Sequence, residues 1–565
     1  MKLAKLSQCM LISMGAIVIG LPVPAGAEMI DGAATYRWKT VVNNKVVMPD
    51  STKTFNSYNQ PSINNNGLVV MRARSKGGSG VEPVHGIYTR DMKNPGNSKI
   101  VKILDRTTKV PDPNNTEATF NETPSFPRMD ADSDTFAFRG SSAPVWNVTD
   151  PVTGAVVTKL GTTSLFMPYQ GKLINAVNQL GASPGFARFQ VPGANALTKF
   201  DQFPGAPSPY RNKVAFKGNY TQNELQADGV TLLAVGKTGV FYRDVKKKGG
   251  LAEVIRVADT KTRIPNQPKR GQVTFGSTAP PSVSGERMVF AGFDNEDAPS
   301  LGGIYIAQLV PNAKVRTLVG IGDSVPEGGR GATFNKIGEG MSFNGRWVAF
   351  WGAWGVQTKQ VTLVCPTDGN KARIQYCLEH DNNKVVDVPI NQGFFVHDSI
   401  THKTTMLAQT GENGLDEFLY WNYSGSPPNT GPGDEGESDG SDEGDDREPP
   451  RWRSSAFVAV SNVRAVGTVI AYKATTANKA QGIYLTYGPG VKRHNAIRVL
   501  DTTTLGQTID PEAPAGSVVT SLGIERDGFR GRRLALTASM VDPVTTESIA
   551  GVYVTKVSKQ PKAGE

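Results

Sequence analysis

The sequence predicts an all-β protein, and more specifically a seven-bladed β-propeller closed by an N-terminal strand that completes the last blade. Three observations predict this fold: a short motif that recurs along the chain, turn-and-strand patterns on either side of it, and chain ends that complement each other. Glycine (61 residues) and proline (37) are plentiful, and long helical periodicity is absent. This composition favours many short strands joined by turns.

The recurring motif is a glycine followed by an apolar and then an aromatic residue. A turn and a β-branched or aromatic run precede most copies, as in Asn344-Gly345 to Phe350, and this pattern is typical of a buried strand. Each unit supplies three or four strands, and four-stranded sheets repeated radially form a β-propeller. The copies are Gly86-Ile87-Tyr88, the degenerate Ser164-Leu165-Phe166, Gly239-Val240-Phe241, Gly303-Ile304-Tyr305, Gly393-Phe394-Phe395, Gly482-Ile483-Tyr484 and Gly551-Val552-Tyr553.

The two ends of the chain complement each other. The seventh unit ends near Val557 with no outer strand after it, and the segment from Lys39 to Pro49 resembles that missing strand as it occurs from Arg316 to Pro326. The N-terminal strand should therefore complete the last blade and close the ring. A solenoid is the alternative, but it needs capped ends rather than complementary ones.

An aspartate follows the outer strand of several units, at Asp105, Asp259, Asp323 and Asp501. Aspartate suits a turn, and a proline further on in three of these copies would end a strand ladder. These carboxylates are therefore interpreted as turn caps rather than ligands.

The repeated blocks Asn66-Gly67 to Met71 and Asn344-Gly345 to Phe350 resemble those of bacterial exported proteins described as choice-of-anchor tandem repeat, NxxGxxVAF-containing. The resemblance covers most of the chain after residue 27, although the copies Asp134 to Phe138 and Lys213 to Phe216 depart from the pattern. It implies a repeat fold and no established activity.

Residues 1–27 have the features of a secretory signal peptide: two lysines, an apolar run from Met10 to Val23, and small residues ending at Ala27. Residues 28–565 are then expected to form a single propeller domain that is secreted or periplasmic. No second apolar run is long enough to predict a membrane span. Cys365 and Cys377 are the cysteines left after cleavage, and in an oxidising compartment they predict a local disulfide. A zinc site is disfavoured because the other ligands are missing at normal spacing.

The charge is unevenly distributed. The whole chain has a net charge of +10, and the two lysines of the signal peptide leave +8 for the rest. The tract Asp434–Glu448 carries nine acids against Arg447, so the remainder carries +16. A basic body could attract an anionic polysaccharide or another envelope component, with nucleic acid less expected. A soluble surface with surplus lysine is the simpler interpretation.

Two stretches interrupt the repeat, at about 355–390 with the cysteine pair and at about 422–454 with the acidic tract. The acidic tract could bind calcium through carboxylate oxygens. The EF-hand pattern fails, however, because a frame starting at Asp439 places Pro450 where the bidentate glutamate belongs. The glycine, serine and proline between the acids favour a disordered, solvated loop.

Trp347, Trp351 and Trp354 crowd into eight residues and could form a sugar-stacking platform, although packing between blades is the favoured interpretation. The sequence identifies no catalytic residue, cofactor site or metal site: the histidines lack HExxH spacing, and there is no nucleophile elbow or P-loop. The pair His397 and His402 has the setting of a hairpin turn, and His85 is expected at a blade edge. The histidines are His85, His380, His397, His402 and His494.

The sequence therefore favours an exported propeller that binds an anionic polymer or an envelope partner at one face of the ring. The alternative is a polysaccharide lyase acting on a uronate-containing polymer, with a His or Tyr base and an Arg that neutralises the uronate. Some lyases are similar in using seven-bladed propellers, but that likeness concerns the fold alone.

Overall fold

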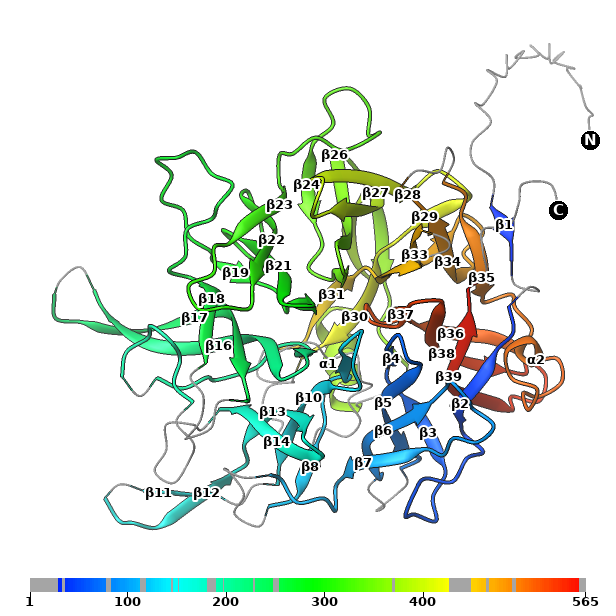
Figure 1. The fold of residues 1–565 in the computed structure, drawn as a ribbon, viewed down its shortest axis with the longest axis horizontal. Helices are drawn as coiled ribbons and strands as arrows, with labels where there is room; N and C mark the ends of the chain where they lie inside the picture. The colour runs from blue at the N-terminus through cyan, green and yellow to red at the C-terminus, as the bar shows by residue number, and fades with distance from the viewer. Residues whose placement is uncertain are drawn as a thin grey trace, which may run out of the picture.

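The computed structural model describes residues 29–32, 36–77, 83–111, 118–143, 146–150, 152–179, 189–196, 198–226, 229–246, 254–367, 371–425, 449–463, 467–489 and 494–557. Over these residues the chain forms seven small sheets in a ring, which confirms the predicted seven-bladed β-propeller (Figure 1). The predicted signal peptide lies outside the described residues. No helix in the described part of the chain is long and apolar enough to cross a membrane.

Each blade has four strands, numbered here from the axis outward, and the first strand is split into two pieces in every blade except blade 3. Blade 1 contains β3 (Phe55–Tyr58), β4 (Ser62–Ile63), β5 (Leu68–Ser75), β6 (His85–Asp91) and β7 (Val101–Asp105). Blade 2 contains β8 (Phe120–Glu122), β9 (Arg128–Met129), β10 (Phe136–Ser142), β13 (Thr163–Tyr169) and β14 (Lys172–Asn178), with an inserted hairpin of β11 (Trp146–Thr149) and β12 (Val156–Leu160). Blade 3 contains β15 (Ser208–Tyr210), β16 (Lys213–Leu225), β17 (Leu232–Asp244) and β18 (Ile255–Asp259).

The remaining blades follow the same plan. Blade 4 contains β19 (Ser277–Thr278), β20 (Ser282–Ser284), β21 (Arg287–Phe293), β22 (Gly302–Gln308) and β23 (Arg316–Gly320). Blade 5 contains β24 (Phe334–Ile337), β25 (Ser342–Asn344), β26 (Trp347–Leu363), β27 (Lys384–Asp398) and β28 (Lys403–Gln409). Blade 6 contains β29 (Leu415–Glu417), β32 (Val458–Val463), β33 (Gly467–Thr476), β34 (Gln481–Tyr487) and β35 (Ile497–Asp501). Blade 7 contains β36 (Val518–Gly523), β37 (Phe529–Arg530), β38 (Arg533–Val541), β39 (Ser548–Lys556) and the N-terminal β2 (Lys39–Asn43).

The N-terminal strand closes the ring as predicted. Strand β2 pairs antiparallel with β39 and forms the outermost strand of blade 7, with Lys39 opposite Val554 and Asn43 opposite Gly551. Val41 and Val42 of β2 are fully buried between blades 7 and 1. The short β1 (Ile30–Asp31) is added in parallel to β35 at the outer edge of blade 6.

The glycine of the recurring motif marks a close approach between the third and fourth strands of a blade. A Cβ atom at Gly303 would lie 2.1 Å from the carbonyl oxygen of Val319, and one at Gly86 would lie 2.1 Å from that of Leu104. The pairing register shifts one residue later, between Ile304 and Tyr305 in blade 4. At these positions the motif glycine is therefore a structural requirement, because a Cβ atom would collide with the fourth strand; blade 2, the exception, carries Ser164.

The innermost strand pieces of neighbouring blades contact one another in the closed sequence β4, β9, β15, β20, β25, β32 and β37. Buried charges fill the axis between them. The Arg128 guanidinium donates to Asp527 Oδ2 at 2.7 Å, to the Pro281 carbonyl at 2.6 Å and to Ser282 Oγ at 2.9 Å. Arg530 also pairs with Asp527. One network thus joins blades 2, 4 and 7 across the axis.

Candidate functional site

The two interruptions of the repeat pack together and form one cap on a single face of the ring. The second and third strands of blade 5 run on past the blade, and between them lies α1 (Lys371–His380). The second interruption forms a separate hairpin of β30 (Tyr420–Ser424) and β31 (Arg451–Ser455). We use "cap" for residues 358–390 and 420–455 as far as they are described. In Figure 1, α1, β30 and β31 lie over the middle of the ring.

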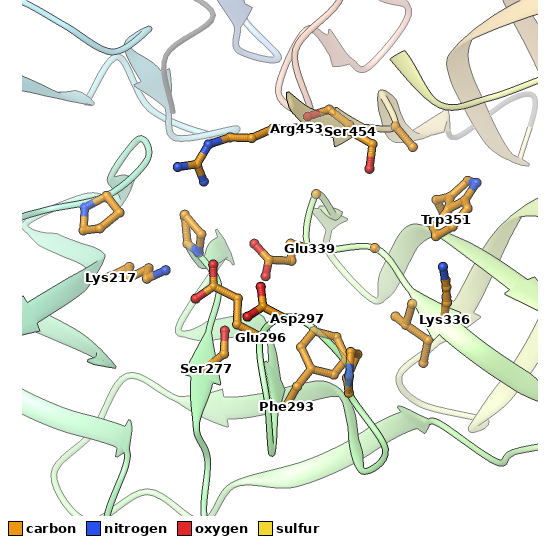
Figure 2. A pocket seen from close by; sticks show the side chains of 18 of the residues that line it. Lys217, Ser277, Phe293, Glu296, Asp297, Lys336, Glu339, Trp351, Arg453 and Ser454 are labelled. Atoms are coloured by element: carbon orange, nitrogen blue, oxygen red, sulfur yellow. The ribbon is translucent and has the colours of Figure 1, made fainter. Parts of the chain in front are cut away.

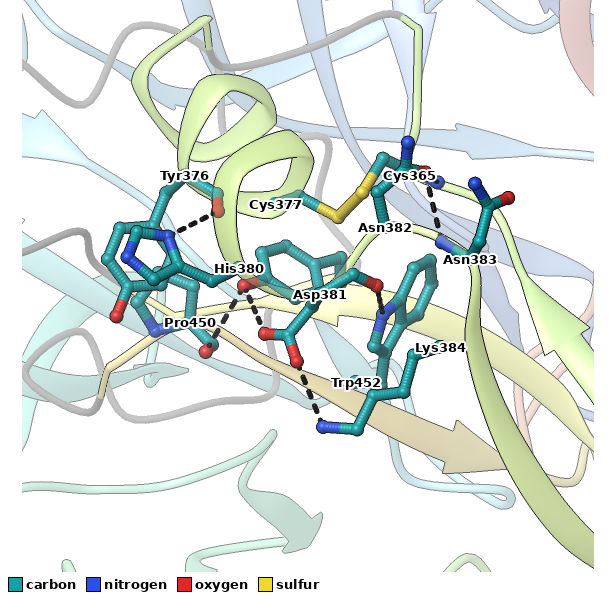
Figure 3. Close-up of a disulfide and its surroundings, with 11 residues drawn as sticks. Cys365, Tyr376, Cys377, His380, Asp381, Asn382, Asn383, Lys384, Pro450 and Trp452 are labelled. Atoms are coloured by element: carbon teal, nitrogen blue, oxygen red, sulfur yellow. Dashed lines mark hydrogen bonds and ion pairs between the residues drawn. A yellow bond between two sulfur atoms is a disulfide. The ribbon is translucent and has the colours of Figure 1, made fainter.

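The Cys365–Cys377 disulfide is present, as predicted, and it lies at the centre of the cap (Figure 3). The Cα atoms of the two cysteines are 5.9 Å apart, and Tyr376, Tyr423 and Trp452 pack around them. Tyr423 Oη donates to Asp381 Oδ2 at 2.7 Å, and Trp452 Nε1 donates to the Asp381 carbonyl at 3.2 Å. The disulfide therefore fixes α1 as the surface on which the second hairpin packs.

The acidic tract Asp434–Glu448 belongs to the connection between β30 and β31 and lies outside the described residues. Its calcium binding and its disorder stay predictions. In the part of the chain that is described, no group of three or more His, Cys, Asp and Glu side chains could hold a metal ion.

A cleft of about 1300 Å³ lies between the cap and blades 3 to 6 (Figure 2). Lys217 of β16, Ser277 of β19 and Lys336 of β24 line it from the ring, and Trp421 and Arg453 line it from the cap. Glu525 and Arg526 extend the lining to the charged network at the axis. The cleft is larger than the roughly 300–1,000 Å³ of typical small-molecule sites, so it can hold a segment of a longer ligand.

The lining carries charges of both signs. In Figure 2, Arg453 reaches into the space across from the carboxylates of Glu296, Asp297 and Glu339, and Lys217 and Lys336 lie at opposite sides. The acidic lining residues are Asp201, Glu296, Asp297, Glu339, Asp387 and Glu525. The basic ones are Lys217, Lys237, Lys336, Arg453 and Arg526. The cleft is therefore close to neutral, although the body of the protein is basic.

Tyr220 is the tyrosine that lines the cleft, on β16. Burial raises its pKa to about 12, and the charge of Asp259 together with a 3.4 Å hydrogen bond to that carboxylate adds to the shift. Its phenol therefore remains protonated at neutral pH and serves as a hydrogen-bond donor rather than a base.

The three crowded tryptophans pack between blades, as the favoured interpretation predicted. Trp347 and Trp351 lie in the cluster between blades 5 and 6, whereas Trp354 lies in the cluster between blades 4 and 5. All three are less than 10% exposed. Trp351 Nε1 donates to Gln392 Oε1 at 3.2 Å and the side chain reaches the cleft at its edge. These tryptophans offer no open stacking face.

None of the five histidines lines the cleft. His397 closes β27 and bonds to Thr404 Oγ1 at 2.9 Å across the turn, as its sequence setting predicted. His85 begins β6, opposite Arg74. Burial lowers the pKa of His85 to about 3, with the charges of Arg72, Arg106 and Arg74 acting in the same direction.

The aspartates after the outer strands are turn caps, as interpreted. Asp105, Asp259 and Asp501 each accept hydrogen bonds from the backbone two residues on, at 2.9, 3.1 and 2.9 Å. Each also pairs with a basic residue three positions earlier: Lys102, Arg256 and Arg498. Asp323 accepts from the backbone of Gly320 at 2.7 Å.

Apart from Trp351, sequence reasoning did not single out the residues that line the cleft. They come from the first three strands of several blades, from connections between strands and from both insertions, and none carries a chemical motif. The one available signal was their order along the chain: the first interruption follows the second strand of blade 5, and the other follows the first piece of the innermost strand of blade 6, so the two start at the same face of the ring.

Comparisons with known proteins identify no family for this chain. No family model matches the chain, and no curated protein matches it. Among solved structures, an acylaminoacyl peptidase in complex with Z-Gly-Gly-Phe-chloromethyl ketone is 8% identical, with a TM-score of 0.37, and the match covers 89% of this chain and 51% of that one. The β-propeller domain of the Trilobed protease from Pyrococcus furiosus is 9% identical over 79% of this chain and 97% of that one, with a TM-score of 0.26. Trypanosoma rangeli sialidase is 8% identical over 80% and 59%, with a TM-score of 0.31. This chain thus spans about half of the first of these proteins, and the likenesses concern the fold alone.

Proposed function

We propose that the protein is an exported binding protein that holds a segment of an extended polar ligand in the capped cleft. The observation that carries the proposal is the cleft itself: about 1300 Å³, framed by two insertions that pack together, the first of them closed by a disulfide. Binding sites usually lie on such loops, carried by a rigid scaffold.

A polysaccharide that carries carboxylates at intervals is the ligand class that we propose. Its carboxylates would pair with Lys217, Lys336 and Arg453, and its hydroxyl groups would donate to Glu339 and to the amides of the lining. The side chain of Trp421, which is half-buried in the cap, offers an apolar surface for a sugar ring. A uniformly anionic polymer such as nucleic acid would meet six carboxylates, which disfavours it.

The lyase alternative needs a base beside the uronate. No histidine lines the cleft, so a histidine base is missing. Tyr220 has a pKa of about 12, so its protonated phenol is not suited to abstract a carbon-bound proton at neutral pH. Binding without chemistry is therefore the function that the cleft supports best.

The test is titration calorimetry of the full chain with hyaluronan, in which a uronate alternates with an uncharged sugar, and with an uncharged glucan as the comparison polymer. We expect the uronate polymer to bind, and the variants Trp421→Ala and Arg453→Gln to weaken its binding by about fivefold or more, since each removes a contact worth roughly 1–3 kcal/mol. Lys172→Ala on the outer strand of blade 2 is the matched control and should bind normally. The same mixtures are followed for the absorbance of an unsaturated product, whose appearance would establish the lyase instead. Equal affinity for both polymers, or undiminished binding by both cleft variants, would refute the proposal.

A further inference from the structure

Strands β16 and β17 continue past blade 3 as a two-stranded ribbon. The two strands pair in one unbroken register that ends with Leu225 opposite Leu232, whereas the pairing of β17 with β18 reaches only as far as Gly239. In Figure 1 the ribbon extends outward from blade 3, away from the axis of the ring. Among the described strands, none pairs with the outer side of β17 from Leu232 to Gly236. This part of β17 is therefore an open sheet edge within the described structure.

The backbone of this edge presents unpaired groups to solvent. The Thr238 carbonyl accepts a 3.2 Å hydrogen bond from the Thr260 N–H, on the side of β17 that faces away from β16. Along an antiparallel strand every second residue points its N–H and C=O to the same side, so those of Leu232, Ala234 and Gly236 also face away from β16. No hydrogen bond within the described part of the chain reaches these six groups. They are the donors and acceptors that another strand would pair.

The side chains of the edge are apolar and exposed. Leu232 and Leu233 are 64% and 53% exposed. Residues 230–236 include no charged residue and no proline, which are the usual protections of an edge strand against pairing. The nearest charges on the ribbon, Lys237 and Glu224, pair with each other at 2.9 Å. An edge of this kind favours association with another strand, and no unpaired charge on the ribbon opposes it.

We propose that this edge is the interface of a homodimer, in which β17 pairs antiparallel with β17 of a second copy. The free edge is symmetric about Ala234, so a two-fold axis at that residue pairs all six outward groups of each copy. Leu232 then lies opposite Gly236 of the partner subunit, a position where a Cβ atom would meet nothing within 4 Å and where a leucine therefore has room. Leu233 lies opposite Val235 of the partner subunit, so apolar side chains meet on the other face as well. This self-complementarity is the reason for proposing a second copy rather than an unrelated peptide.

The test measures the mass of the purified protein by sedimentation velocity at rising concentrations, up to about 200 μM. The contact involves fewer residues than the roughly 20–30 a side of a standard interface, so we expect a weak dimer whose population grows with concentration. Ala234→Pro removes an outward N–H and places a ring at the two-fold axis, but it breaks no hydrogen bond between β16 and β17. Because the dimer carries this change twice, we expect the dissociation constant to rise at least about tenfold.

The matched control is Asn223→Pro, since Asn223 lies directly opposite Ala234 on β16 and points its N–H to the other edge of the ribbon. This variant should dimerise like the parent protein. Near-UV circular dichroism establishes that both proline variants are folded. A dimer that persists undiminished in Ala234→Pro, or that Asn223→Pro weakens to the same extent, overturns the proposed interface.

A cross-linking experiment tests the position of the axis without proline. Residues that exchange both backbone hydrogen bonds have Cα atoms about 5.5 Å apart, which is within the range of a disulfide. In a Cys9→Ser background, Ala234→Cys should therefore form a covalent dimer on mild oxidation, whereas Asn223→Cys should not. The proposal is also overturned if the parent protein stays monomeric at every concentration, or if the two cysteine variants cross-link equally.

Discussion

The charged network at the axis should make Asp527 the most sensitive position of the ring. Its carboxylate is 2% exposed and is contacted by Arg128 and Arg530, which are 0% and 1% exposed. Asp527→Asn keeps the shape of the side chain but leaves the guanidinium groups of Arg128 and Arg530 buried without the carboxylate that they share. Glu525, at 3.7 Å from Arg128, is then the remaining counter-charge. Breaking a buried ion pair from one side costs roughly 3–5 kcal/mol, and we expect a loss in the free energy of unfolding within that range.

The assay is urea unfolding of the parent and the variant, followed by tryptophan fluorescence. The double variant Asp527→Leu with Arg530→Met should lose less stability than Asp527→Asn, because it removes a buried charge together with its partner and leaves Glu525 to balance Arg128. A loss below about 1 kcal/mol for Asp527→Asn, or a larger loss for the double variant, would refute the view that uncompensated charge governs the axis.

The pH dependence of the same difference gives an independent check. Burial acts to raise the pKa of Asp527, but the charges of Arg128 and Arg530 and the hydrogen bond from Arg128 outweigh burial and hold the pKa below its usual value. The unfolded chain binds a proton at a pKa of about 3.9. The stabilisation by Asp527 is therefore fully present above that pH and is lost as the pH falls through the lower pKa of the folded state. The difference between parent and Asp527→Asn should be constant from about pH 5 to pH 8 and should shrink in acid.

Three further predictions concern closure, the motif and the cap. Removal of residues up to Asp50 deletes β2 and exposes the apolar edge of blade 7, so the truncated protein should lose cooperative thermal unfolding; a melting curve like that of the parent would contradict closure by this strand. Gly303→Ala places a Cβ atom 2.1 Å from the Val319 carbonyl and should lower the free energy of unfolding by more than about 2 kcal/mol. The control is Gly285→Ala, where a Cβ atom meets nothing within 4 Å but φ is +61°, and it should lower the free energy of unfolding by about 1 kcal/mol. Equal losses would show that close approach is not the cause. The double variant Cys365→Ser with Cys377→Ser should release α1, so amide hydrogen exchange in residues 371–381 should become faster while exchange in the inner strands stays the same. Unchanged slow exchange in α1 would show that packing alone holds the helix in place.

The fold could be predicted because each blade repeats one local requirement. The close approach at Gly303 and Gly86 demands glycine, and the turns after several outer strands use an aspartate such as Asp501. The same residues therefore recur in most of the repeats. Strand β2 was recognisable for the same reason, since it is the displaced fourth strand of a repeat. The weaker copies in blades 2 and 3 still follow the plan, because buried aromatic side chains such as Phe166 and Phe216 maintain the packing between blades.

The site could not be predicted in the same way, because its contacts join segments that no repeat relates. The bonds from Tyr423 and Trp452 to Asp381 span 42 and 71 residues, and Arg128 reaches across 399 residues to Asp527. Each of these depends on a single side chain and on the closed ring that brings the segments together. The sequence identified the interruptions as the place for function, but it treated the two as separate loops.

The contrast between the periphery and the capped face explains why the repeats say little about function. The outer turns carry the same aspartate and basic residue in blades 1, 3 and 6, where Asp105, Asp259 and Asp501 each satisfy backbone groups of their own turn. At the capped face, neighbouring blades carry different connections: a long two-stranded ribbon on blade 3, the acidic loop of Glu296 and Asp297 on blade 4, and the disulfide-bonded stem on blade 5. A blade tolerates such variation because these connections lie beyond its four paired strands, so a change there does not disturb the packing between blades. The ring therefore supplies position and rigidity, and the chemistry of the cleft depends on residues that are free to differ from one blade to the next.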